Sequence, residues 1–390
     1  MGTARVRIAL PPGGEGGYDI VIREGVLCDM AEGTSLLTGA TSIFIVTDSN
    51  VARIYASRVR GELSKMGKRV RVVAIPAGES NKNIRTAWAL ASRLSGLGAD
   101  RGSVLLALGG GVVGDLAGFV ASIYKRGVDY IQLPTTLLAQ VDSSIGGKTG
   151  VDAPWGKNQV GTFHQPRGVL TDPLALKTLP RTEMLNGLAE IIKCSVVADR
   201  KMFDKVSSLT DPGSTVPMDL IVRACQIKAG IVSKDPRETN LRTVLNYGHT
   251  VGHALESASD YRQSHGSCVV FGMLAEGWIA SSLGILQKSD FERLEGFLIP
   301  FSKGIDRPNA LDKAKLFNFT LADKKSSASK VRMSLPGEIG KMYITEDGSY
   351  RVPVSKETFE GSVDYLHDVL ASFGAQGTGV QHRGPRQSHG

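Results

Sequence analysis

The first half of the chain alternates short apolar runs with amphipathic stretches. Apolar runs of strand length, several rich in β-branched residues, occupy residues 41–48, 70–78, 103–111 and 128–134. Apolar positions with helical spacing follow the first three runs, over residues 51–66, 84–97 and 112–127. Strands that alternate with helices of this length form parallel sheets covered on both faces. The pattern therefore predicts a doubly wound, Rossmann-like α/β domain.

After about residue 179 the pattern becomes helical. Long stretches with helical periodicity cover residues 181–208, 218–236, 242–259, 266–284 and 356–373. A length of 390 residues also exceeds the usual size of one hydrophobic core. We therefore expect an α/β domain over residues 1–179 and a mainly α-helical domain over residues 180–373. Residues 374–390 lack apolar periodicity, and we expect them to be disordered.

Composition narrows the class of protein. Hydrophobic residues make up 42% and charged residues 22%, as in ordinary soluble proteins. No apolar run reaches the ~18 residues of a membrane span, and the N-terminus lacks the apolar segment of a signal peptide. These features predict a cytoplasmic protein without membrane contact.

The four cysteines are far apart and form no CxxC pair, which argues against a disulfide framework and a cysteine-rich zinc site. Cys225 and Cys268 lie in apolar patterns, so we expect both to be buried.

The net charge of +8 allows two kinds of partner. Lysines and arginines are spread along the whole chain, and no arginine-rich arm or RNA- or DNA-binding motif is present. A modest basic excess suits a small anionic substrate equally well. We therefore expect no nucleic-acid partner.

A glycine cluster follows the third predicted strand. Gly109, Gly110, Gly111 and Gly114 lie where an apolar strand changes into a helix. Free amides at a helix N-terminus, together with missing Cβ atoms, allow a diphosphate to approach closely. An ordinary glycine-rich turn explains the cluster as well, because the spacing is not G-x-G-x-x-G and the standard Rossmann motif follows the first strand.

Histidines gather in the second half of the chain. His249 and His253 are four residues apart, so they share one helix face, and His265 follows after a loop. Two imidazoles on a helix and a third ligand are a common way to hold zinc. Histidines that bind no metal remain the alternative. The pair lacks the glutamate of HExxH, so it does not indicate a metalloprotease.

Two further segments combine charge with unusual surroundings. Glu190 and Lys193 lie three residues apart in an otherwise apolar helical pattern, and a buried carboxylate needs a partner such as a metal. A surface ion pair is the simpler alternative. Residues 134–166 combine glycines with Asp142, Lys148, Lys157 and Asn158, as in a phosphate-binding loop or a flexible surface loop.

Taken together, these segments resemble the 3-dehydroquinate synthase family. The resemblance extends over roughly residues 40–340 and rests on residues 124–152, 156–166, 176–193, 241–256 and 323–325. It implies conversion of 3-deoxy-D-arabino-heptulosonate 7-phosphate into 3-dehydroquinate and phosphate, in the shikimate pathway. It also implies transient reduction of NAD and a divalent metal, with zinc favoured over cobalt.

The resemblance assigns roles to individual positions. Metal ligands fall on Glu190, His249 and His265, which replaces His253 as the third ligand suggested by spacing. NAD contacts fall on Asp48, Asn50, Glu79, Lys82, Gly110, Gly111, Gly114, Asp115, Thr135, Thr136 and Thr178, with Lys148 and Lys157 at the border to the substrate. Substrate contacts fall on Arg126, Asp142, Lys148, Lys157, Asn158, Lys193, Lys228, Arg242, Asn246, His253 and Lys324.

Within this set, catalytic roles are implied for Asp142, Lys148, Asn158, Lys193 and His253. Lysines and Asn158 suit the phosphate, Arg242 and Lys228 suit the substrate carboxylate, and His253 suits proton transfer. Arg126 matches a residue that reaches a neighbouring subunit, which implies a homodimer. Ser267 stands where the family often has a glutamate, which would weaken support for a metal histidine if that glutamate provides it.

Three alternatives remain at this point. A sister cyclase of the 2-deoxy-scyllo-inosose or valiolone type acts on a substrate without a carboxylate, so it has less use for Arg242 with Lys228. A metal-dependent NAD alcohol or polyol-phosphate dehydrogenase shares the glycines and histidines but not the lysine-rich middle segment. A regulatory protein that has kept the fold is the non-enzymatic alternative.

Overall fold

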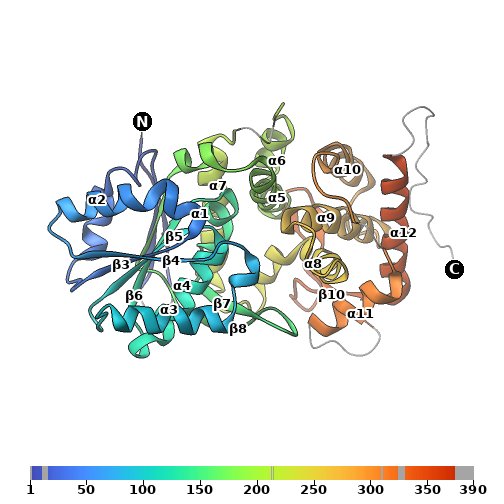
Figure 1. Ribbon diagram of the computed structural model, residues 1–390. Coiled ribbons are helices and arrows are strands. Elements are labelled where there is room, and N and C mark those ends of the chain that lie inside the picture. Colours follow the sequence, from blue (N-terminus) through green and yellow to red (C-terminus); the bar gives the residue numbers. More distant parts are fainter. Residues whose placement is uncertain are drawn as a thin grey trace. The chain divides into compact units, whose positions relative to one another are not determined.

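The computed structural model describes residues 2–10, 16–211, 213, 215–308, 311–323 and 330–373 (Figure 1). The chain divides into two compact units. The first comprises Met1–Gly187 and Gly213–Arg237, and the second comprises Leu188–Pro212 and Glu238–Gly390. The predicted disordered tail, residues 374–390, lies outside the described residues.

The first unit is built on a seven-stranded sheet with the strand order β1-β2-β9-β6-β5-β3-β4. All neighbouring strands in it are parallel except β1, which pairs antiparallel with β2. The strands are β1 (Ala4–Ile8), β2 (Tyr18–Ile22), β3 (Ile43–Asp48), β4 (Val70–Ile75), β5 (Val104–Gly109), β6 (Asp129–Pro134) and β9 (Gly168–Thr171).

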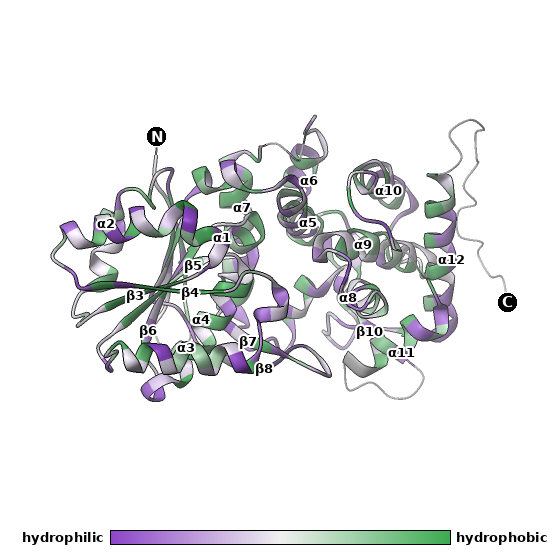
Figure 2. Cartoon of the chain, in the orientation of Figure 1, coloured by the Kyte–Doolittle hydropathy of each residue, from purple (hydrophilic) through white to green (hydrophobic). Residues whose placement is uncertain are grey.

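Helices cover both faces of this sheet, as the alternation along β5 shows. Leu105 and Ala107 pack with residues of α3 and α4, whereas Leu106 and Leu108 point to the opposite core, which contains residues of α2. β3 is coloured as hydrophobic along most of its length, whereas α2 mixes both colours (Figure 2). The helices of this unit are α1 (Ser49–Val51), α2 (Ser57–Lys65), α3 (Ile84–Gly96), α4 (Gly111–Ile123) and α7 (Met218–Lys234). The predicted doubly wound architecture is confirmed.

The second unit is mainly helical, as predicted. Its helices are the second part of α5 (Arg181–Ala198), then α6 (Arg200–Ser207), α8 (His249–Ala258), α9 (His265–Ser282), α10 (Lys288–Ser302), α11 (Lys313–Asp323) and α12 (Lys356–Ser372). Two small antiparallel sheets accompany them, β10 (Lys330–Met333) with β13 (Val352–Ser355) and β11 (Pro336–Glu338) with β12 (Lys341–Met342). Within the described residues, none of the helices combines the length and apolar character needed to cross a bilayer.

The division into units differs from the expected boundary at residues 179/180. It falls within α5, after Gly187, and α7 belongs to the first unit. The reason is packing: α7 lies against β1 and against the π-helical turn η6 (Ala139–Ser143). Helical periodicity predicts the existence of such a helix, but not the core on which its apolar face packs.

Two long helical patterns are each interrupted. The pattern over 181–208 forms α5 and α6, because Asp199 accepts a hydrogen bond from the Met202 amide and starts a new helix. The pattern over 242–259 forms the 3₁₀ helix η8 (Leu241–Asn246) and α8, which are separated by Gly248 with φ of 77°. This left-handed conformation favours glycine.

The middle segment is not an irregular loop. After η6 it forms the antiparallel hairpin β7 (Lys148–Ala153) and β8 (Gly156–Phe163). A Cβ atom on Gly161 would overlap the carbonyl oxygen of Thr149 on the facing strand. Glycine is therefore required for the strands to approach, and it removes the alternating pattern that would have predicted them.

Candidate functional site

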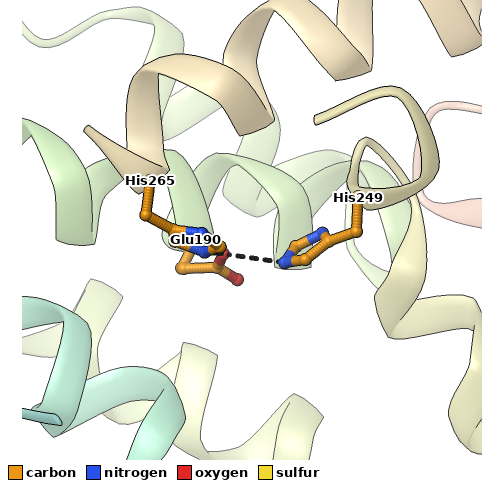
Figure 3. Close-up of side chains that lie close together, drawn as sticks. All are labelled: Glu190, His249 and His265. Atoms are coloured by element: carbon orange, nitrogen blue, oxygen red, sulfur yellow. Dashed lines mark hydrogen bonds and ion pairs between the residues drawn. The ribbon is translucent and has the colours of Figure 1, made fainter. Parts of the chain in front are cut away.

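The second unit brings together three side chains that can hold a metal ion. Glu190 from α5, His249 from the start of α8 and His265 from the start of α9 offer ligand atoms within 4.8 Å of one another. Oε1 of Glu190 lies 3.3 Å from Nε2 of His249 and 3.2 Å from Nε2 of His265 (Figure 3). The predicted ligand set therefore converges, although the three residues are distant in sequence.

The outer nitrogens of both histidines have their own partners. Nδ1 of His249 lies 3.1 Å from the Tyr247 carbonyl oxygen, and Nδ1 of His265 lies 2.6 Å from a carboxylate oxygen of Glu256. Each Nδ1–H can thus donate outward, so that each Nε2 faces the shared space and can bind an ion once it carries no proton. One carboxylate and two imidazoles with this orientation match the donor chemistry of catalytic zinc sites. The residues fit a zinc or cobalt ion.

Charges near the cluster shift the pKa values of its members. Burial raises the pKa of Glu190, but the Lys193 ammonium and the two imidazoles outweigh it and hold that pKa well below its usual range. Burial and Lys193 lower the pKa of His249 to about 4. Burial also lowers the pKa of His265, but the Glu190 and Glu256 carboxylates overcome this and raise it to about 10. Glu190 is therefore ionised and His249 neutral at neutral pH, as metal ligands must be.

Glycines allow α8 and α9 to approach closely enough to carry this cluster. A Cβ atom on Gly272 of α9 would overlap the carbonyl oxygen of Gly248. A Cβ atom on Gly252 of α8 would lie 3.0 Å from the carbonyl oxygen of Cys268. Backbone contact at both positions sets the separation of the helices, and with it the separation of His249 and His265. Cys268 and Cys225 are buried, as expected.

Two other predicted residues adjoin the cluster. Lys193 forms an ion pair with Oε2 of Glu190, and its side chain is only 2% exposed. The His253 ring lies 5.3 Å from the His249 ring and 6.4 Å from the His265 ring, measured between centroids. The Glu190–Lys193 pair is thus buried and not a surface ion pair, and His253 is close to the three candidate metal ligands.

The remaining predicted residues of the second unit lie on or beyond η8. Arg242 is buried, and the Asn246 side-chain amide donates to Glu238, with 2.6 Å between the heavy atoms. Glu238 has a left-handed φ of 59°. Lys324 lies outside the described residues.

In the first unit, the predicted cofactor residues lie where parallel strands end. Asp48 ends β3 and accepts hydrogen bonds from the amides of Asn50 and Val51. Gly110 follows β5 and caps α4, and Thr135 and Thr136 follow β6. Ligands of open α/β sheets bind outside the carboxyl ends of their strands.

Missing side chains allow close packing around the start of α4 at this edge of the sheet. A Cβ atom on Gly110 would lie 2.9 Å from Cγ2 of Thr136, and one on Gly114 would lie 2.7 Å from Oε1 of Gln132. Gly111, the first residue of α4, would bring a Cβ atom within 3.1 Å of the Ser143 hydroxyl. Each of these glycines therefore permits its backbone to approach a neighbouring side chain closely.

Lys82 connects two other predicted residues, Asp115 and Asn158. Its buried ammonium lies 2.6 Å from Oδ2 of Asp115 and donates to Oδ1 of Asn158, also at 2.6 Å. Burial lowers the pKa of Lys82, but Asp115 and the nearby Glu79 outweigh it and raise that pKa. Asn158 has a left-handed φ of 55°. Lys82 thereby ties the start of α4 to the β7–β8 hairpin.

The other predicted residues of this unit are more scattered. Lys228 of α7 lies 2.5 Å from Oδ1 of Asp142, and Thr178 bonds to the Tyr55 hydroxyl at 2.7 Å. Lys148 begins β7 and is exposed, and Lys157 lies near the start of β8. Arg126 is exposed and has a φ of 69°.

Sequence reasoning missed two buried glutamates, Glu256 and Glu276. Glu256 bonds to His265 and so provides the support that a glutamate at position 267 would give if it contacted a metal histidine. Ser267 instead donates to the Asp306 carbonyl, so its substitution leaves His265 supported. The spacing holds a signal: Glu256 is three residues after His253 and seven after His249, on the same helix face.

Comparison with known families gives this geometry a context. The family model for the N-terminal part of 3-dehydroquinate synthase matches residues 72–186, and that for the C-terminal part matches residues 187–326. The chain belongs to the 3-dehydroquinate synthase family. A 3-dehydroquinate synthase of Thermodesulfovibrio yellowstonii is 44% identical over 336 residues, covering 85% of this chain and 94% of that protein.

Solved structures of related cyclases share the fold. A 2-deoxy-scyllo-inosose synthase in complex with carbaglucose-6-phosphate, NAD⁺ and Co²⁺ has a TM-score of 0.83 and 25% identity, covering 93% of this chain and 99% of its own. The 2-epi-5-epi-valiolone synthase of Streptomyces hygroscopicus, with NAD⁺ and Zn²⁺ bound, has a TM-score of 0.78 and 25% identity. The match covers 92% of this chain and 99% of that one. The predicted family and fold class are thus confirmed.

Proposed function

We propose that the protein is a 3-dehydroquinate synthase. It converts 3-deoxy-D-arabino-heptulosonate 7-phosphate into 3-dehydroquinate and phosphate, a carbon–oxygen lyase reaction that requires NAD and a divalent metal. The observation that carries the proposal is the convergence of Glu190, His249 and His265 in a chain whose family is established. The 44% identity to a protein of that name, over 94% of its length, supports the substrate.

The metal is held by the Glu190 carboxylate and by Nε2 of His249 and His265, and zinc or cobalt suits this donor set. When bound, such an ion supplies Lewis-acid polarisation of a substrate oxygen. The protein sets the tautomers of the two histidines, because the Tyr247 carbonyl and the Glu256 carboxylate each keep a proton on the Nδ1 atom that they face.

NAD is assigned to the carboxyl edge of the sheet in the first unit. The diphosphate is assigned to the start of α4, where the helix N-terminus supplies free amides and Gly110, Gly111 and Gly114 carry no Cβ atoms. NAD supplies a hydride acceptor that is regenerated in each cycle, so the overall reaction is redox-neutral. The remaining assigned contacts are Asp48, Asn50, Glu79, Lys82, Asp115, Thr135, Thr136, Lys148, Lys157 and Thr178.

The charged residues divide between the two anionic groups of the substrate. Lys148, Lys193 and Asn158, with Lys324, are assigned to the phosphate, because ammonium groups act as compact point charges. Arg242 and Lys228 are assigned to the carboxylate, which a guanidinium can grip with two parallel hydrogen bonds. His253 is assigned proton transfer, Asp142 the ring hydroxyls, and Asn246 a further substrate contact.

The substrate is a small anionic sugar phosphate, and the enzyme acts in the cytoplasm as part of the shikimate pathway. Arg126 is assigned to the active site of the neighbouring subunit of a homodimer. Its exposed side chain supports this assignment. Size-exclusion chromatography with light scattering gives the mass of a dimer if the assignment is right.

A sister cyclase is the competing function, because two solved structures that share the fold, a 2-deoxy-scyllo-inosose synthase and a 2-epi-5-epi-valiolone synthase, belong to that class by name. Purified protein with NAD and Zn²⁺ is given the heptulosonate phosphate or, as the substrate without a carboxylate, glucose 6-phosphate. We expect phosphate release from the first alone, without accumulation of NADH absorbance. No release from the heptulosonate phosphate would overturn the proposal, and steady NADH accumulation would indicate a dehydrogenase.

A further inference from the structure

Two buried glutamates lie on the helices that carry the metal histidines. Glu256 is on α8 and is 3% exposed, and Glu276 is on α9 and is 0% exposed. A buried carboxylate is costly unless hydrogen bonds compensate it. Glu256 bonds to His265 of α9, and Glu276 bonds to backbone amides at the start of α8, beside His249.

Glu256 acts across the helix pair on a side chain. It lies near the end of α8, and its Oε1 is 2.6 Å from Nδ1 of His265 at the start of α9. The bond fixes the rotation of the His265 ring, and it requires the proton to be on Nδ1. Nε2 is then free for the metal.

Glu276 acts in the opposite direction, on the backbone. Its two carboxylate oxygens accept from the amides of Gly248, at 2.7 Å, and Val251, at 2.9 Å. The N-cap residue of α8 is Gly248, which has no side chain to satisfy these amides. The two amides lie on either side of His249, so the carboxylate fixes the first turn of the helix at the metal ligand.

We propose that Glu256 and Glu276 are positioning residues that form a reciprocal pair, in which each helix holds the metal ligand of the other. This inference rests on the proposed function, because it assumes a metal at Glu190, His249 and His265. The pair preorganises two ligands that come from different helices. Its loss lets the imidazoles rotate or the first turn of α8 shift, which lowers metal affinity.

The test compares four variants of the full-length protein: Glu256→Ala, Glu256→Gln, Glu276→Gln and the control Glu295→Gln. Glu295 accepts a hydrogen bond from the Tyr365 hydroxyl at 2.8 Å, so its variant alters a carboxylate contact of the same unit without touching the ligands. Co²⁺ and Zn²⁺ affinities are measured by competition with a chelator, far below the unfolding temperature. Circular dichroism verifies the fold, and the visible absorption of bound Co²⁺ reports ligand geometry.

Outer partners of metal ligands contribute roughly 10–100-fold to affinity, so we expect losses of that size in Glu256→Ala and Glu276→Gln. Glu256→Gln should lose less than Glu256→Ala, because the amide oxygen can still accept from Nδ1–H. The Co²⁺ spectrum should change in Glu256→Ala and Glu276→Gln, and Glu295→Gln should match the wild type. If Glu276→Gln does not fold, Glu276→Asp is measured instead, because it keeps the charge but is one methylene shorter.

Affinities and spectra equal to wild type in folded Glu256→Ala and Glu276 variants would overturn the inference, even if their melting temperatures fall. That result would make both glutamates purely structural. If the wild-type protein itself binds neither metal, the metal assignment of the proposed function fails, and this inference fails with it.

Discussion

In the first unit the candidate cofactor residues lie where parallel strands end, whereas in the second unit the candidate metal ligands lie on helices. Asp48 is the last residue of a strand of the central sheet, and Gly110 and Thr135 each follow one. Glu190, His249 and His265 come from three helices and meet at a buried carboxylate. The sheet needs little more than its topology to gather the first set. The second set depends on close helix packing and on buried hydrogen bonds.

This difference predicts how each region responds to change. A groove at the end of a sheet tolerates local substitutions, because neighbouring strands keep their register. A cluster shared by three helices loses its geometry when any one contact between them is altered. The second region should therefore show the larger effects.

The largest effect is expected from Glu190→Gln. The substitution keeps the volume but removes the charge that both imidazoles and Lys193 face. Metal affinity and phosphate release should fall by more than the roughly 100-fold that loss of an outer partner costs. Metal content by mass spectrometry and a phosphate-release assay measure both, and NAD affinity should remain unchanged.

Glu183→Gln is the matched control for this prediction. Glu183 lies on the same helix, but it is exposed, and it accepts a hydrogen bond from the side-chain amide of Asn186. Its variant should retain metal and activity. Full turnover by Glu190→Gln would show that the metal assignment is wrong.

The next effect concerns the separation of α8 and α9. Gly272→Ala would push a methyl group into the Gly248 carbonyl, so the helices must move apart. We expect a loss of about 3 kcal/mol in the free energy of unfolding, the upper range of overpacking, together with weaker metal binding. Urea denaturation measures the first and chelator competition the second.

Gly296→Ala provides the contrast, since its Cβ atom would meet nothing within 4 Å. Gly296 lies inside α10, where alanine is the better helix former, so this variant should gain about 0.5–1 kcal/mol. Equal effects of the two substitutions would contradict the close-packing account.

These cases also show what the sequence can and cannot predict. The strands of the first unit are predicted by continuous apolar runs, and Gly110 by its place after one of them. The sequence indicates a functional role for Glu190 only because its helix is otherwise apolar. Its role as a metal ligand was predicted from family resemblance. Spacing alone selected His253 over Glu190, because it detects neighbours on one helix and not residues that meet through tertiary packing. The placement of α7 was missed for the same reason, whereas the β7–β8 hairpin was missed because its glycines remove the alternating pattern of a strand.

A smaller effect is expected from Gly110→Ala at the edge of the sheet. The new methyl group would lie 2.9 Å from Cγ2 of Thr136, so the turn assigned to the NAD diphosphate must shift. NAD affinity should fall about tenfold, which corresponds to the free energy of about one hydrogen bond. Metal affinity should remain unchanged. Fluorescence titration with NAD measures this, and Gly61→Ala on α2, which has open space at its Cβ, should match the wild type. Loss of metal in Gly110→Ala would show that the two regions are not separable.

The smallest expected effect is the release of protons when the protein binds metal. Burial lowers the pKa of His265, but Glu190 and Glu256 raise it to about 10, whereas burial and Lys193 lower that of His249 to about 4. At pH 8, protein stripped of metal therefore carries one proton that metal binding at Nε2 of His265 must displace. Calorimetric titration with Zn²⁺ in two buffers of different ionisation enthalpy should give release of about one proton.

The same pKa values fix the direction of a stability effect. His265 has a higher pKa in the folded protein than the ordinary 6.5, so its contribution is complete below pH 6.5 and is lost as the pH rises through about 10. Protein from which a chelator has removed the metal should therefore lose stability between pH 7 and pH 10. Zinc-loaded protein, in which Nε2 of His265 binds the ion, should not lose this contribution. Parallel losses in both forms would mean that His265 is not a ligand. That outcome would remove the contrast between a metal centre gathered by helices and a cofactor site gathered by strands.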